Sequence, residues 1–178
     1  MKRKTLLLLL IMAIIANYAI SQNAKTKQQI KQEKKEKELK EWHELKKFIE
    51  EKDFVFTGSL LDGQAVDPKI NFIYVNGDNA TIQFANGFGG GPNGIGGITV
   101  EGKITKFTVK AKKEGKAITV LFTVSPKLGQ GARGPITINI SAYSFYSAYV
   151  GINSYTGAME GEIKQKAKSK IFEGNKLN

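Results

Sequence analysis

The chain has 178 residues, a formal net charge of +11 and no cysteine. The absence of cysteine excludes disulfide bonds, thiolate metal ligands and a cysteine nucleophile, and this length allows one domain to bury a stabilising core. The positive charge does not indicate a nucleic-acid-binding protein, because Arg133 is the only arginine beyond Arg3 and arginine makes most bidentate contacts to bases and phosphates.

Residues 1–21 have the three parts of a secretory signal peptide. Basic residues at positions 2–4 precede an apolar run over residues 6–16, and Ala19 and Ser21 suit a cleavage site. The apolar run is too short to cross a bilayer. We therefore expect export to the periplasm or the extracellular side of a Gram-negative envelope, with no transmembrane span after cleavage. The alternative is that this segment is kept as an uncleaved anchor.

Residues 22–53 contain no glycine or proline and are rich in lysine and glutamate, which favours a helix. Apolar residues recur at spacings of three and four in the second half only, and these are Leu39, Trp42, Leu45, Phe48 and Ile49. We expect a helix from about Gln28 to Glu51 whose C-terminal half docks on the rest of the chain and whose polar first half projects into solvent. The only histidine, His43, has no second histidine to complete a zinc site, and we expect no metal.

Residues 54–163 form short runs in which apolar and polar residues alternate, as in residues 136–140. The pair Asn76-Gly77 between two such runs is a strong signal for a β-hairpin. About eight strands with short connections predict a mainly β fold, a single antiparallel meander. We expect a small barrel or a curled sheet, with a two-layer sandwich as the alternative. Residues 164–178 are a basic tail that we expect to be frayed.

The segment FANGFGGGPNGIGGITVEG, residues 84–102, contains a formal G-x-G-x-x-G match. A dinucleotide-binding loop needs a helix that begins within the motif. Another strand follows here, so we do not expect phosphate binding. We interpret the segment as a flexible strand connection or as a lid over an opening that carries Phe88 as an apolar contact. The glycines of this lid are Gly87, Gly89, Gly91, Gly94 and Gly97.

Aromatic residues between positions 143 and 155 form the second candidate surface. Alternation along one strand predicts that Tyr149 shares a face with Phe145, and that Tyr146 shares the opposite face with Val150. The face outside the core would expose rings that bind partners or sugars, unless they are cross-strand packing pairs. Arg133 joins the set because a guanidinium in a loop can clamp a carboxylate. The candidate ligand-binding residues are Phe84, Phe88, Tyr143, Tyr146, Tyr149, Tyr155 and Arg133.

Glu160 and Glu162 are two residues apart and would share a face of a strand. Such a pair suits the acid–base chemistry that cleaves glycosidic bonds. Gly161 between them and the basic tail beyond them favour a solvated edge instead. We therefore assign no catalytic residue and no cofactor.

The order of these segments resembles an exported Bacteroidota family called "domain of unknown function 4251". The matching pieces are a Lys/Glu-rich helix before DFVFTG, then INFIYVNGDNATIQF, GGITVEGKI, KFTVKAKKEGKAITVLFTV and ITINISAYSFYSAYVGINSYTGAMEGEI. The resemblance covers roughly residues 45–163. It implies an exported β-domain without an established activity. Members usually carry an aromatic, arginine-containing turn, F-G-R-A-Y, where this chain reads FANGFGGG.

We expect a non-enzymatic protein that binds a small ligand or a partner. That hypothesis predicts a sizeable apolar cavity or cleft lined by tyrosine and phenylalanine and roofed by residues 84–97. The alternative is an envelope-associated interaction protein that uses its charged helix, and a fully packed interior would favour it. A hydrolase is the weakest of the three hypotheses. The partner would be a small molecule or an envelope protein, with weak contact to anionic surfaces through the lysines of the helix and tail.

Overall fold

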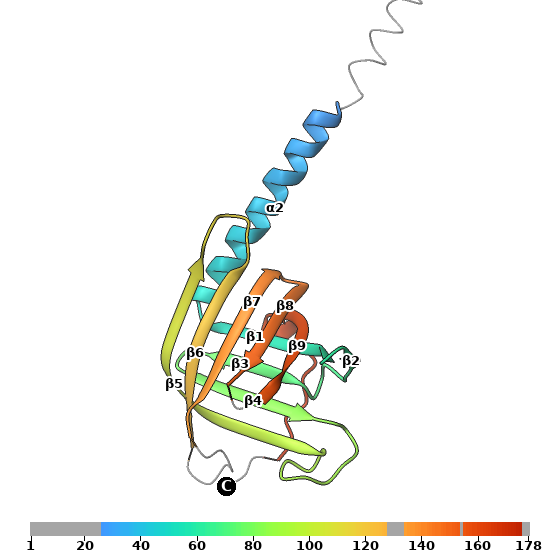
Figure 1. Cartoon of the computed structure of the whole chain (residues 1–178), viewed down its shortest axis with the longest axis vertical. Helices are drawn as coiled ribbons and strands as arrows, with labels where there is room; N and C mark the ends of the chain where they lie inside the picture. The colour runs from blue at the N-terminus through green and yellow to red at the C-terminus, as the bar shows by residue number, and fades with distance from the viewer. Residues whose placement is uncertain (1–25, 128–133, 154, 176–178) are drawn as a thin grey trace, which may run out of the picture. The chain divides into compact units, whose positions relative to one another are not determined.

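The computed structural model describes residues 26–127, 134–153 and 155–175 (Figure 1). The chain divides into two compact units, residues 1–38 and 39–178. The helices are α2 Lys27–Glu50 and the 3-10 helix η1 Lys166–Lys168. The strands are β1 Asp53–Leu61, β2 Gln64–Ala65, β3 Phe72–Asn76, β4 Asn79–Ala85, β5 Gly97–Ala111, β6 Ile118–Pro126, β7 Ile136–Ser144, β8 Ser147–Ile152 and β9 Tyr155–Lys164.

Eight of the strands close into an antiparallel barrel. Neighbours follow the order β1-β3-β4-β5-β6-β7-β8-β9, and β9 pairs with β1 to close the ring. The short β2 pairs with the last two residues of β1, Leu60 and Leu61. Closure leaves no long unpaired edge among these strands, which is how many short antiparallel strands avoid edge-to-edge association. The antiparallel meander predicted from the sequence is confirmed. Of the two architectures considered, the strands form the barrel and not the two-layer sandwich.

Strand alternation fills the barrel interior with apolar side chains. Phe56 lies opposite Ile73 across the β1–β3 pair, and Ile73 lies opposite Ile82 across the next pair. Successive side chains along a strand point to opposite faces of the sheet. Once one residue of a strand points inward, every second residue along that strand therefore points inward as well. The interior is completed by fully buried rows from the later strands, including Ile118, Val120, Phe122, Ile138, Ile140 and Val150.

Helix α2 begins with a capping box, in which Thr26 and Gln29 exchange backbone-to-side-chain hydrogen bonds. Residues 27–38 are all exposed, as their polar composition predicts. In the second unit, the last turns of the helix bury Leu45 and Ile49 in the core of the barrel. The docking of the C-terminal half is therefore confirmed.

The single tryptophan fixes the docked end of α2. Trp42 Nε1 donates a hydrogen bond of 2.6 Å to the backbone oxygen of Lys116, in the connection between β5 and β6. Phe48 packs against Phe145, with ring centroids 5.8 Å apart, at the connection between β7 and β8. These contacts place the end of the helix over one end of the barrel, away from the β4–β5 connection (Figure 1).

The tail after β9 is not frayed over its described residues, which corrects the prediction. Backbone N–H groups of Phe172 and Asn175 donate to the oxygens of Lys69 and Asn93, each at 2.8 Å. The amide of Gln83 donates to Phe172 O at 2.7 Å and accepts from Gly174 N at 2.8 Å. We call residues 169–175 the C-terminal strap, and these hydrogen bonds hold it on the outer wall of the barrel. Composition alone does not reveal that the strap has hydrogen-bond partners there.

Candidate functional site

The barrel interior does not contain the sizeable cavity that the sequence led us to expect. Among the described residues, the apolar cavity at the barrel mouth has a volume of about 60 Å³, whereas pockets for small molecules usually exceed about 300 Å³. Its lining residues are Leu61, Phe84, Val150, Ile152, Gly157 and Met159, with no tyrosine. The prediction is wrong because large side chains such as Phe54 and Phe122 fill the interior.

The glycine-rich segment is a hydrogen-bonded loop rather than a lid over that cavity. Asn93 is 1% exposed, and its side-chain oxygen accepts from the backbone N–H groups of Ile95 and Gly97. Phe88 is 91% exposed. Gly97 is required by close approach, since a Cβ there would lie 1.8 Å from the backbone oxygen of Phe84. No helix follows the loop, in agreement with the rejection of a dinucleotide site.

The aromatic residues of β7 and β8 expose three tyrosines, but not in the predicted arrangement. The chain turns at Phe145 and Tyr146, so alternation restarts there and Phe145 packs on the core. Tyr149 points outward, opposite to the buried Ala148 and Val150. Tyr143 is 57% exposed, Tyr146 84% and Tyr149 43%. We call these three residues, with Glu160, the tyrosine face.

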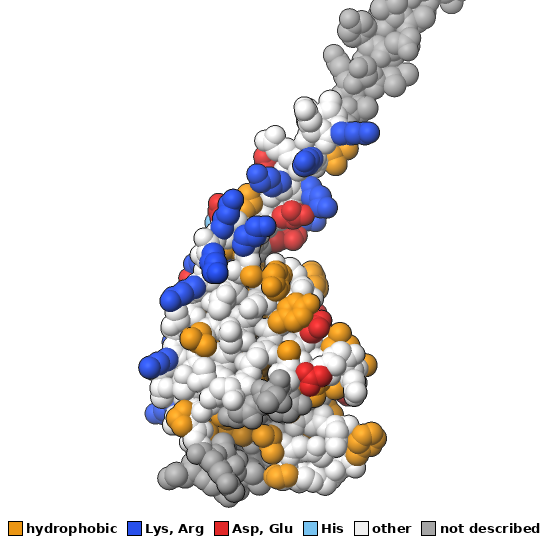
Figure 2. Space-filling view, in the orientation of Figure 1, with side chains coloured by type: hydrophobic (Ala, Val, Ile, Leu, Met, Phe, Trp, Pro, Cys, Tyr) orange, Lys and Arg blue, Asp and Glu red, His pale blue; other side chains and the backbone are white. Residues whose placement is uncertain are grey.

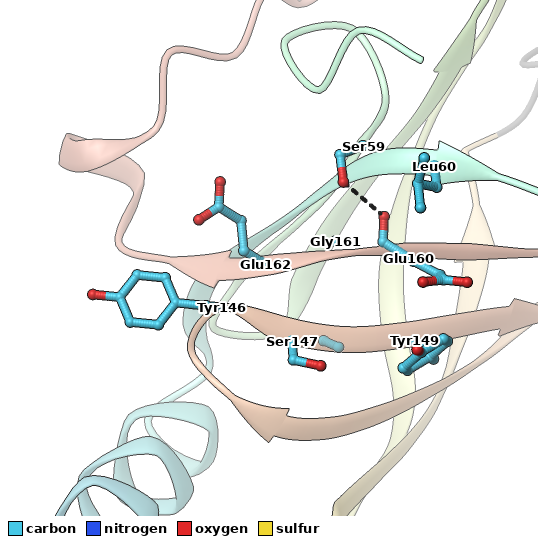
Figure 3. Close-up of a pocket in the computed structure, with 9 residues that line it drawn as sticks. Ser59, Leu60, Tyr146, Ser147, Tyr149, Glu160, Gly161 and Glu162 are labelled. Carbon is cyan, nitrogen blue, oxygen red and sulfur yellow. Dashed lines mark hydrogen bonds between the residues drawn. The ribbon is translucent and has the colours of Figure 1, made fainter. Parts of the chain in front are cut away.

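A shallow depression of about 180 Å³ lies on the tyrosine face (Figure 3). It is lined by residues of β1, β8, β9 and the turn before β8, namely Ser59, Leu60, Tyr146, Ser147, Ala148, Tyr149, Glu160, Gly161 and Glu162. The antiparallel register sets Glu160 between Tyr149 on one side and Leu60 on the other. Gly161 allows β1 to approach closely, because a Cβ there would lie 2.0 Å from the backbone oxygen of Thr57.

The tyrosines pair edge to face at this depression. The rings of Tyr143 and Tyr149 have centroids 5.9 Å apart at an interplanar angle of 84°, a favourable geometry for aromatic pairs. The pair shows that cross-strand packing, the alternative raised from the sequence, accounts for part of this arrangement. Tyr146 makes no ring pair among those found in the described chain and stands at the turn, the most exposed of the three.

The two carboxylates of the depression differ in their surroundings. Glu162 forms an ion pair with Lys164, with Nζ and Oε1 2.5 Å apart. Glu160 lies opposite Tyr149 in the register of β8 and β9, and its negative charge, followed by partial desolvation, raises the pKa of Tyr149. Although both residues share the outer face, as predicted, their carboxylates point toward different ends of the depression (Figure 3). They do not face each other across a cleft as a glycosidase pair would.

A second surface feature, a groove of about 540 Å³, adjoins the depression within the second unit. It lies between the end of α2 and the end of β9, and it shares Tyr146 and Glu162 with the depression. Its other lining residues are Glu44, Phe48, Phe145, Ile163, Lys164, Gln165 and Lys168. The sequence did not predict this groove, since it depends on how the helix and the tail meet the barrel.

The charged side chains are segregated around the barrel. Lys103, Lys106 and Lys110 are exposed on the outer side of β5, and lysines gather along the left edge of the view in Figure 2. The only charged residues of β7, β8 and β9 are Glu160, Glu162 and Lys164. The alternation in KFTVK could have revealed part of this basic strip on β5, because Lys106 and Lys110 fall opposite Phe107 and Val109. Lys103 has the parity of Phe107, and it joins the strip through the irregularity between Ile104 and Lys106.

Two candidate residues cannot be placed in the site, and His43 lies away from it. Arg133 lies outside the described residues, as does the side chain of Tyr155. His43 is exposed and pairs with Glu114, with Nε2 and Oε1 2.5 Å apart. In the described part of the chain, no three histidine or acidic residues are grouped so that they could hold a metal ion. Nor is any described helix long and apolar enough to cross a membrane.

A closed eight-stranded antiparallel barrel with one helix packed over its end defines the class of this protein. The chain belongs to the family described as Domain of unknown function (DUF4251), whose sequence profile matches residues 31–163. It is similar to the crystal structure of a DUF4251 family protein from Bacteroides eggerthii, with 23% sequence identity and a TM-score of 0.51. That match covers 76% of this chain and 92% of the other. No curated protein matches the chain.

Proposed function

We propose that this chain is an exported, non-enzymatic binding protein of the cell envelope, and that it binds on the tyrosine face. The observation that supports the proposal is the group of three tyrosines, each at least 43% exposed, beside a depression on the outer wall. Exposed aromatic residues grouped in this way mark interaction sites, since each ring offers apolar area and a polar hydroxyl. The packed interior directs the proposal to the outside of the barrel.

A binding role is favoured over a catalytic one by the carboxylates. Glu162 is engaged with Lys164, and Glu160 lies opposite Tyr149, whose pKa its charge raises. Neither arrangement pairs a general acid with a general base at a reacting bond. Tyr143, Tyr149 and Glu160 are held on strands, which suits rigid recognition, and Tyr146 stands at the turn beside them.

The test is native mass spectrometry and affinity capture of the protein purified from its own envelope. A variant in which Tyr143, Tyr146 and Tyr149 are all serine should lose the co-purifying molecule. The variant Phe88→Ser is the matched control, because it removes an even more exposed aromatic ring from the glycine-rich loop. Equal capture by the triple variant, or loss in the Phe88 variant alone, would contradict the proposal.

The second candidate function is interaction through the charged helix. It is favoured by two observations. Residues 27–38 are exposed throughout and bury no apolar side chain, and large side chains fill the barrel interior. The segment is held as a helix by local pairs such as Lys34 with Glu38, whose Nζ and Oε1 atoms are 3.9 Å apart. The lysines of this segment are exposed, which suits weak contact with anionic surfaces.

A further inference from the structure

We infer that the depression beside Tyr149 and Glu160 binds a small organic cation, an ammonium group carried on a compact apolar body. The inference rests on the proposed function and names the chemical class of its ligand. It is argued from the surroundings of Glu160, from the rings beside it, and from the distribution of charge around the barrel.

Glu160 offers a carboxylate that no cation of the described chain neutralises. Its side chain is half-buried and lies opposite Tyr149 in the register. The lysine nearest along the strand, Lys164, is engaged with Glu162. A carboxylate accepts about four hydrogen bonds when ionised, so Glu160 has acceptor capacity to offer a ligand. Partial burial also strengthens its attraction for a positive charge.

The aromatic rings beside Glu160 make the site selective for a cation with apolar substituents. Ring faces carry negative electrostatic potential and attract ammonium groups, including quaternary ones. Tyr149 lies directly opposite Glu160 in the register, Tyr143 packs on Tyr149, and Tyr146 lines the same depression. A metal ion would need several converging oxygen ligands, whereas this site offers one unpaired carboxylate and ring surfaces.

The charge pattern of the barrel requires that the cation come from outside the molecule. The three lysines of the basic strip lie on β5, whereas β7 and β8 contain no charged residue. Hydroxyl groups of Ser59 and Ser147 line the depression and can accept hydrogen bonds from an ammonium N–H. The volume of about 180 Å³ suits a small molecule or one side chain of a partner.

The test compares choline with its neutral isostere 3,3-dimethyl-1-butanol, in which carbon replaces the charged nitrogen. Each is titrated into the full exported protein at constant ionic strength, and backbone amide shifts are followed by NMR. Choline should shift the amides of Ser147, Tyr149 and Glu160 in a saturating manner, and the neutral alcohol should not. Equal shifts with both compounds, or none with choline, would overturn the inference.

Two matched variants locate the charge that matters. Glu160→Gln should weaken choline binding about tenfold or more, whereas Glu162→Gln should change it less than twofold because Lys164 already engages that carboxylate. Both substitutions keep side-chain size, and the same NMR spectra report whether each variant is folded. A third variant, Tyr149→Leu, should also weaken binding. Choline binding that survives in Glu160→Gln would overturn the inference.

The source of the ammonium group is tested with two tripeptides, Gly-Lys-Gly and Gly-norleucine-Gly. Binding of choline but not of the lysine peptide supports a free small molecule, and preference for the lysine peptide shows that the cation is a partner's side chain. Failure here is separable from failure of the proposed function. If choline does not bind but the triple tyrosine variant still loses its captured partner, the face binds something other than a cation.

Discussion

Glu160 brings together the features of the site at the scale of single residues. Its backbone is fixed by pairs with Tyr149 and Leu60, and the neighbouring Gly161 lets β1 and β9 approach closely. Its charge acts on Tyr149 because ionising the phenol would place two negative charges together. The carboxylate thus raises the pKa of Tyr149 above the usual value of 10.0.

Removing that charge should lower the pKa of Tyr149 toward its usual value. We expect this in Glu160→Gln, because the amide is neutral, and we expect no comparable change in Glu162→Gln, whose carboxylate is engaged with Lys164. The pKa is measured by NMR titration of the Tyr149 ring carbons. An unchanged pKa in Glu160→Gln would show that Glu160 does not set the electrostatics of the depression.

At the scale of elements, the C-terminal strap and the glycine-rich loop form a shared polar layer over the outer wall. Gln83 is completely buried and bonds to Ile70 O, to the strap and to the hydroxyl of Thr99. Thr99 in turn accepts a hydrogen bond from Asn93 of the loop. Such a network stabilises only while every member has its partner.

Replacing Gln83 by leucine should destabilise the barrel by about 2–4 kcal/mol, because it leaves buried groups of the strap and of Thr99 without partners. The free energy of unfolding is measured in urea by the fluorescence of Trp42, the only tryptophan. The control Gln64→Leu changes an exposed glutamine of β2 and should cost less than about 0.5 kcal/mol. Equal costs for the two variants would contradict the role of the buried network.

Local sequence patterns predicted most of the helix and strands. The features that they missed depend on contacts between residues far apart in the sequence. The alternation at Ile136, Ile138 and Ile140 depends only on which face of the strand is buried. It can therefore be predicted from the local sequence. The outward Gln83 looks like any polar wall residue until a segment about 90 residues later covers it. The same reason made the tail appear frayed.

The sequence named the three tyrosines of the candidate site but not their arrangement or their neighbour. It considered Glu160 only as a catalytic acid and set it aside, whereas the structure places it beside the tyrosines on one face. The predicted partition failed because Phe145 and Tyr146 form a turn without glycine, asparagine or proline, the usual turn signals. Phe84 and Phe88 were included among the candidates because they lie beside or within the glycine-rich loop. Neither residue lies on the tyrosine face.

At the scale of the whole molecule, charge and burial are unequally divided between the two units. The described residues of the first unit are helical, exposed and rich in lysine and glutamate. Every buried apolar residue in the described part of the chain belongs to the second unit, including Leu45 and Ile49 at the end of α2. The folding energy should therefore reside in the second unit.

Deleting residues 23–38 should leave the barrel folded, with a melting temperature within about 2 °C of the intact chain, because no buried side chain is lost. Leu45→Ala is the contrasting change and should cost about 3 kcal/mol, since it leaves a cavity at a fully buried position. Both are measured by thermal and urea unfolding. If the deletion also keeps the captured partner, the charged helix is not the binding surface, whereas loss of the partner would favour the second candidate function.

Closure of the barrel by its first and last long strands has a consequence for the order of folding. Val55 pairs with Lys164, which is 109 residues later (164 − 55). Contacts so distant in sequence form slowly because a long loop must be ordered first. A chain that ends before β9 would hold β1 and β8 as open edges, and unpaired edges recruit other chains. The last strand therefore does more than add contacts, because its arrival converts an association-prone sheet into a closed wall.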